Sequence, residues 1–121
     1  MIGKKSWIIP DGFLQPKSLG EQISHEAVCV LNLTEEHASI RLTFYFEDMD
    51  PMENFITECG ARRTHHIRLD KIVDQDGKQV PRNVPYAIKV DSSVPIVVQH
   101  SRLDTSQEAL ALFTTMAYPM E

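Results

Sequence analysis

Apolar and polar side chains alternate along much of this chain, and that pattern predicts β-strands rather than helices. In residues 38–47 every even position, from Ala38 to Phe46, is apolar, and the odd positions are polar or amphipathic. Because side chains of an extended strand point alternately to opposite faces, this segment has one face for a core and one wetter face. Further strands are predicted at residues 7–9, 23–33, 55–58, 61–69, 86–91 and 93–103, with a final strand ending near Tyr118.

Turn residues separate these segments. Pro10 is expected to close the first strand, and Asp11-Gly12 to form a turn. A short turn is expected between residues 91 and 93, and one helical turn near Ser106–Ala109. Together these elements predict one domain over residues 1–121. About seven or eight short strands with regular turns indicate an all-β sandwich or a jelly-roll-like barrel, and the predicted fold class is an antiparallel β-sandwich of jelly-roll type.

The composition of the chain limits the classes of protein to which it can belong. With 121 residues, of which 42% are apolar, the chain is long enough to bury one core. Its net charge of -5 argues against a nucleic-acid-binding protein, which relies on a broad basic face. The sequence has neither a membrane-spanning apolar run nor a signal peptide, so a cytoplasmic protein is expected. Cys29 and Cys59 are expected to be free thiols.

The segment at residues 93–104 changes from apolar to polar within one residue, as the wall of a polar site would. His100 and Arg102 share a strand face with the apolar residues before them, so they continue a buried row. A charge on a buried row needs a partner. Glu26, at the entry of the strand at 23–33, is the acidic candidate.

Cationic side chains outnumber this carboxylate, and their excess predicts a pocket for an anionic or polyhydroxylated ligand such as a sugar or organic anion. Arginine forks and histidine donors suit carboxylates and sugar hydroxyls. The residues expected to line the pocket are His25, Glu26, Arg63, His66, Arg68, His100 and Arg102. The competing interpretation is that these groups only tie strands and subunits together, or lie on a solvated face.

No motif in the sequence indicates catalysis. His-x-His, His-Glu-x-x-His, Cys-x-x-Cys and glycine-rich phosphate loops are all missing, and Cys29 lies in an apolar row, where a thiol is unreactive. We therefore expect no catalytic residue, no metal and no cofactor. A metal held by His25, His66, His100 and Glu26, in an enzyme acting on a sugar-like substrate, is a minor alternative.

Three blocks of the sequence, at residues 23–32, 61–68 and 94–104, resemble the sensory rhodopsin transducer family. The resemblance implies a soluble β-sandwich that assembles as a homotetramer, binds small molecules, and in some members serves a membrane photoreceptor. It places His25, Glu26, Arg63, His66, Gln99, His100 and Arg102 at a ligand site. It also makes Trp7 a candidate aromatic platform, although a lone Trp beside a loop is also typical of core packing.

The leading hypothesis is thus a non-enzymatic, signal-transducing module that binds a sugar-like or anionic molecule. The alternative is a cytoplasmic transducer that docks on a membrane photoreceptor, a sensory rhodopsin. A DNA-binding regulator is a weaker hypothesis, since the acidic balance opposes it.

Overall fold

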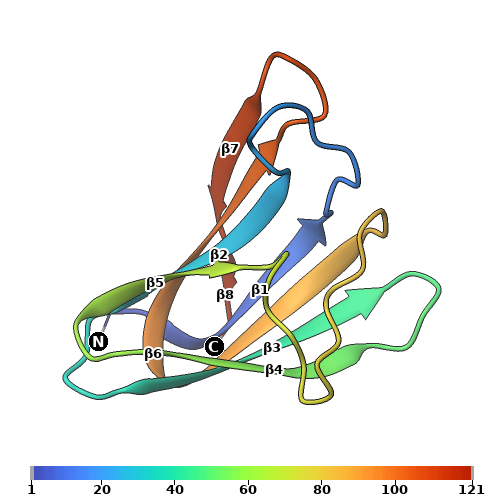
Figure 1. The fold of residues 1–121 in the computed structure, drawn as a ribbon. Coiled ribbons are helices and arrows are strands. Elements are labelled where there is room, and N and C mark those ends of the chain that lie inside the picture. The colour runs from blue at the N-terminus through green and yellow to red at the C-terminus, as the bar shows by residue number, and fades with distance from the viewer. Residues whose placement is uncertain (1, 121) are drawn as a thin grey trace.

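Residues 2–120 fold into eight antiparallel strands joined by turns and loops (Figure 1). The computed structural model describes residues 2–120, and with no helix among them, none is present that could span a bilayer. The strands are β1 (Lys4–Gly12), β2 (His25–Asn32), β3 (Ala38–Phe46), β4 (Met52–Cys59), β5 (Arg63–Arg68), β6 (Tyr86–Asp104), β7 (Ala111–Met116) and β8 (Tyr118–Pro119). The predicted all-β fold class is confirmed.

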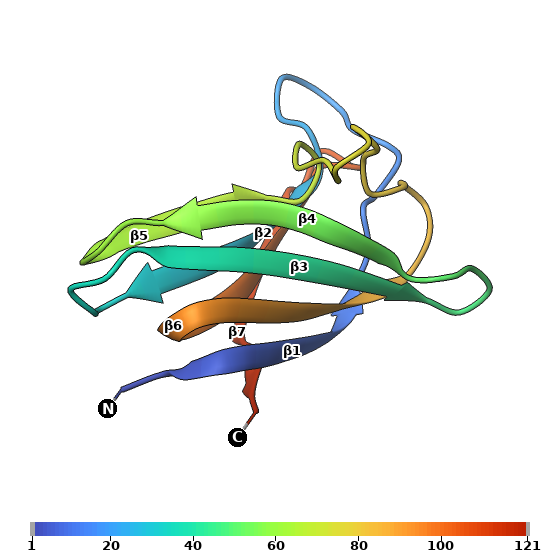
Figure 2. The same ribbon diagram turned by 90° about the horizontal axis from the view of Figure 1, so that it is seen from below.

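Two sheets share the long strand β6. The first sheet has the order β4-β3-β6-β1-β8, and Figure 2 shows its four longer strands side by side. In the second sheet the C-terminal half of β6 lies between β2 and β7, and β5 pairs with the far edge of β2. The two sheets form the predicted sandwich, while the jelly-roll topology stays a prediction.

The turn predicted between residues 91 and 93 is wrong, because β6 runs unbroken for 19 residues. Ser92 still pairs with Ile40 of β3, and Ile96 already pairs with Lys4 of β1. The backbone ladders on both sides therefore keep the strand extended through Ser92 and Ser93, and tertiary context overrides the turn preference of these serines.

Two further local predictions are also wrong. Pro10 does not end β1, which continues to Gly12 with one extra residue opposite β6, a β-bulge. Proline is tolerated there because β8 pairs only with Trp7 and Ile8, so the proline needs no N–H for a ladder. Residues 106–109 form bends rather than a helical turn: the Asp104 Oδ1 accepts the Ser106 N–H at 2.8 Å in a local side-chain turn.

The core lies between the sheets, as the alternation of residues 38–46 predicts. Phe44 of β3 is fully buried and makes edge-to-face contacts with Phe55 and Tyr86, at centroid distances of 4.8 and 5.3 Å. Val28 of β2 and Val98 of β6 face them from the second sheet and are equally buried. This two-sided packing leaves room for polar groups at one end of the inner face, where β2 begins and β6 ends.

Candidate functional site

A buried carboxylate, that of Glu26, is the centre of the inner polar site. In the second sheet Glu26 pairs with Arg102 and Val28 pairs with His100, so all of these residues lie on neighbouring strands. Glu26 and His100 are 0% and 1% exposed; on the inner face of their strands Glu26 precedes Val28 and His100 follows Val98. The period-2 pattern of each strand thus brings the polar residues together.

The Glu26 carboxylate accepts four hydrogen bonds. Its Oε1 receives the Tyr86 hydroxyl at 2.5 Å and His100 Nε2 at 3.1 Å. Its Oε2 receives the Phe13 backbone N–H at 2.9 Å and Arg102 Nε at 2.5 Å. An ionised carboxylate can only accept, so His100 Nε2 carries a proton. We call these five residues the Glu26 network.

The network favours the ionised form of its acid. Burial on its own would raise the pKa of Glu26, but the hydrogen bonds from His100, Tyr86 and Phe13 outweigh it and hold the pKa below its ordinary value of 4.5. Burial and the adjacent carboxylate raise the pKa of Tyr86 well above its usual range, so the phenol stays a donor. Glu26 is therefore the acidic partner of His100 and Arg102, as the sequence predicts.

Arg102 connects the network to the surface. Its guanidinium lies over the ring of Phe113 in β7, with 5.1 Å from Cζ to the ring centroid. The side chain of Arg102 is 23% exposed, yet its Nη2 is buried and has no hydrogen-bond partner among the described residues. A guanidinium has five N–H donors, so the network leaves this one for another acceptor. Phe113 was not predicted for the site, because its place depends on how β7 pairs with β6.

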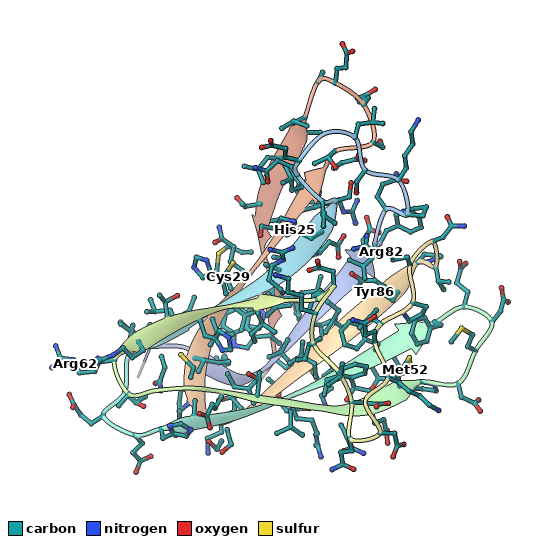
Figure 3. The ribbon with its side chains drawn as sticks, in the orientation of Figure 1. His25, Cys29, Met52, Arg62, Arg82 and Tyr86 are labelled. Atoms are coloured by element: carbon teal, nitrogen blue, oxygen red, sulfur yellow. The ribbon has the colours of Figure 1, made fainter. Side chains whose placement is uncertain are left out.

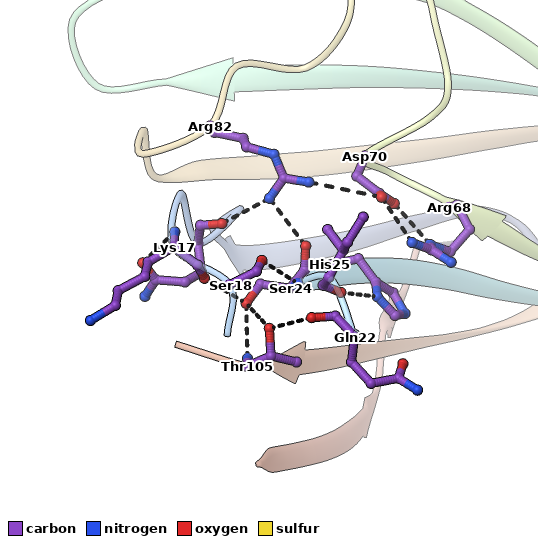
Figure 4. Close-up of polar contacts among 11 residues, drawn as sticks. Lys17, Ser18, Gln22, Ser24, His25, Arg68, Asp70, Arg82 and Thr105 are labelled. Atoms are coloured by element: carbon purple, nitrogen blue, oxygen red, sulfur yellow. Dashed lines mark hydrogen bonds and ion pairs between the residues drawn. The ribbon is translucent and has the colours of Figure 1, made fainter. Parts of the chain in front are cut away.

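A second polar cluster holds Arg68 (Figure 4). Arg68 Nε and Nη2 donate to the two carboxylate oxygens of Asp70, both at 2.8 Å. Burial alone would raise the pKa of Asp70, but the hydrogen bonds and charge of Arg68 hold it below its usual range. Arg82 lies on the other side of Asp70 and donates to the backbone carbonyls of Gln15 and Ser24. The counter-ion of Arg68 is therefore Asp70, which lies two residues later in the chain.

Two of the predicted ligand-binding residues, Trp7 and Arg63, donate their hydrogen bonds to backbone carbonyls. Trp7 is a core residue, 5% exposed, whose Nε1–H donates to the carbonyls of Lys4 and Ile96 at 3.0 and 3.1 Å. Arg63 is exposed at the start of β5 and donates to the carbonyls of the preceding turn. Neither side chain faces the Glu26 network.

The remaining predicted ligand-binding residues, His25, His66 and Gln99, lie on the outer face of the second sheet. His66 and Gln99 line a shallow groove of about 230 Å³ that also includes Cys29 and Met116. His25 and Cys29 both lie on β2, with His25 at the start of the strand (Figure 3). Its Nδ1 is hydrogen-bonded to the carbonyl oxygen of Ile23 at 2.8 Å. Apart from Trp7 and Arg63, the predicted residues thus divide among the inner network, the cluster around Asp70 and the outer face of the second sheet, and the structure does not bring them into one pocket.

Comparison with known proteins decides the family. A family model described as Anabaena sensory rhodopsin transducer matches residues 2–119. The chain belongs to this family. Among solved structures, it is similar to Thermotoga maritima 1070, with 36% identity, a TM-score of 0.87 and coverage of 100% of this chain and 98% of that chain. It is also similar to the Anabaena sensory rhodopsin transducer itself, with 39% identity, a TM-score of 0.75 and coverage of 85% and 90%. No curated protein sequence gives a significant match.

The chemistry of this member of the transducer family is that of hydrogen bonding and charge pairing. Among residues 2–120, no group of three or more His, Cys, Asp or Glu side chains is arranged to hold a metal ion. Burial raises the pKa of the Cys59 thiol, which lies 3.2 Å from the Arg63 carbonyl, and so opposes the reactive thiolate.

Proposed function

We propose that this transducer-family chain is a non-enzymatic cytoplasmic module that binds a small molecule and passes on a signal through its surface. The observation that carries the proposal is the spare donor of Arg102. One edge of the guanidinium is fixed by the buried Glu26 carboxylate, while Nη2 has no partner among residues 2–120. A buried donor without an acceptor is costly, so a ligand acceptor is favoured there.

The ligand class follows from the groups around that donor. A guanidinium suits carboxylate oxygens and vicinal hydroxyls, and Phe113, which is 43% exposed, adds an apolar face beside it. We therefore propose a sugar acid or another anionic, hydroxyl-rich molecule. In this proposal Arg102 binds the ligand, while His100 and Glu26 position the guanidinium.

Strand β7 is the element that we propose responds to the ligand. All six of its residues are exposed, and among the described strands it pairs only with β6. A ligand seated against Arg102 and Phe113 would change how this strand is held, and a partner would sense the change. We further propose that the working assembly is a homotetramer.

Docking on a membrane photoreceptor is the second candidate, and it is favoured by the similarity to a protein named as a sensory rhodopsin transducer. The exposed side chains of Leu112, Phe113 and Met116 on β7 give such a partner an apolar contact. Membranes that contain a sensory rhodopsin should retain the chain, whereas membranes without it should not. Equal retention by both would refute this function.

The ligand proposal is tested by thermal shift with glucuronate, gluconate, neutral sugars and nucleotides. We expect at least one anionic sugar to raise the Tm by about 2–4 °C at saturating concentration. Arg102→Lys keeps the charge but loses the planar fork, so it should abolish the shift. Arg62→Lys, on an exposed turn, is the matched control and should keep it. No shift with any compound, or an equal shift in Arg102→Lys, would overturn the proposal.

A further inference from the structure

A separate hollow lies at the end of the first sheet, where β1 and β3 end and β6 begins. It encloses about 420 Å³ and is lined by Pro10, Tyr45, Pro85, Tyr86 and Ala87, together with Phe46 and two acidic residues. Pockets for small molecules enclose roughly 300–1,000 Å³ and are lined mainly by apolar and aromatic groups. The hollow has the size and the walls of such a site, and its lining includes neither Arg102 nor Phe113.

Particular backbone features create the hollow. The β-bulge between Ile9 and Gly12 displaces Pro10 from the regular ladder with β6. Ala87, which pairs with Tyr45, has a short side chain and leaves space beside the larger ring. Gly12 lets the ring of Tyr86 approach, since a Cβ at this position would lie 2.1 Å from its Cε1. The space is therefore fixed by strand geometry rather than by a loop.

The charge of the hollow has one sign. Asp11 and Glu47 are the acidic residues that line it, and no Lys, Arg or His does so. Neither carboxylate makes an ion pair with any side chain among residues 2–120. Unpaired carboxylates beside aromatic rings favour a cation, which gains from the charge and from the ring faces. An anion would meet repulsion from both acids.

We propose that this hollow binds a small organic cation of the substituted-ammonium class. The cation lies against the ring of Tyr45, with Asp11 and Glu47 at its rim. Tyr86 forms the inner wall, and its hydroxyl bonds to Glu26 on the other side. The cation site differs from the site proposed for Arg102 in its charge and its ligand class, and Tyr86 is the one residue of the Glu26 network that lines it.

Isothermal titration calorimetry with choline tests the proposal, with its uncharged isostere 3,3-dimethylbutan-1-ol as the matched ligand. Choline should bind, and the isostere should bind at least about five-fold more weakly, since only the charged form gains the cation–π and carboxylate terms. Tyr45→Leu and Glu47→Gln should each weaken choline about two- to five-fold. Glu36→Gln, an exposed acid before the other end of β3, makes the same change of charge and should leave the affinity unaltered.

Backbone amide shifts of the ¹⁵N-labelled chain locate the site. Choline should move the signals of Tyr45, Glu47 and Ala87 and leave those of β5 and β7 in place. The proposal is overturned if choline produces no binding heat, if the isostere binds equally well, or if Glu36→Gln weakens choline as much as Glu47→Gln. Amide shifts confined to another surface would overturn it as well.

Discussion

Replacing Glu26 by glutamine tests the central electrostatic claim, that one buried carboxylate holds the inner site together. The substitution keeps the shape of the side chain and removes its charge. Glutamine presents one carbonyl oxygen where the carboxylate has two, so the four donors that converge on Glu26 lose half of their acceptors. The Tyr86 hydroxyl and the other tautomer of His100 can accept from the new amide, but Arg102 can only donate.

The magnitude follows mainly from Arg102. Removing one partner of a buried ion pair costs about 3–5 kcal/mol, because the other charge is left without compensation. The Arg102 side chain is 23% exposed, so water recovers part of that loss, and the lower end of the range applies. We therefore expect Glu26→Gln to lower the free energy of unfolding by about 3 kcal/mol, and the Tm by about 10 °C.

Urea unfolding followed by tryptophan fluorescence measures this change. Trp7 is the one tryptophan of the chain and is 5% exposed, so its emission reports loss of the core. Glu36→Gln removes an exposed carboxylate and should stay within about 0.5 kcal/mol of the wild type. If Glu26→Gln also unfolds within that margin, the carboxylate does not stabilise the fold and the reasoning is refuted.

Three further predictions concern the stability of the fold: its dependence on pH, and its response to substitutions of a glycine and of an asparagine. Because folding lowers the pKa of Glu26, its carboxylate contributes its full stabilisation of the fold above pH 4.5, and this stabilisation is lost as the pH falls through the pKa of the folded state. Acid unfolding followed by circular dichroism should lack this pH-dependent loss of stability in Glu26→Gln. Gly12→Ala should cost about 1–3 kcal/mol in urea unfolding, because its Cβ would overlap the Tyr86 ring. Gly77→Ala, with φ of +80° and nothing within 4 Å, should cost only about 1 kcal/mol. Asn32→Ala should cost about 1–3 kcal/mol, since the buried Nδ2 donates to three backbone carbonyls, and hydrogen exchange should accelerate in the turn after β4.

The inner site was predictable as far as local periodicity reaches. Alternation alone places His100 and Arg102 on one face of their strand and Glu26 with the buried valines of its own, and the structure brings the three together. Tyr86 and Phe113 could not be found in this way. Tyr86 lies 60 positions from Glu26, and Phe113 meets Arg102 only because β7 folds back on β6.

The predicted excess of cations failed for a different physical reason. Counting charges on a strand face ignores the loops that pack against it. Asp70 lies just after β5 and pairs with Arg68, and Arg82 comes from the loop before β6. His66 points to the outer face, away from the Glu26 network. Strand period alone therefore cannot decide whether a row of cations awaits a ligand or already has its counter-ions.

The balance of donors and acceptors also indicates where a transducer of this construction can respond. Inside the Glu26 network every oxygen of the carboxylate is occupied, and moving Tyr86 or His100 would leave a buried polar group unpaired. The core end of the network is therefore stiff. At its outer end the Arg102 Nη2 has no partner among the described residues, and β7 is exposed along its whole length. In the function proposed above, a change of state therefore costs least at this end, and β7 is the strand on which a bound molecule or a partner acts.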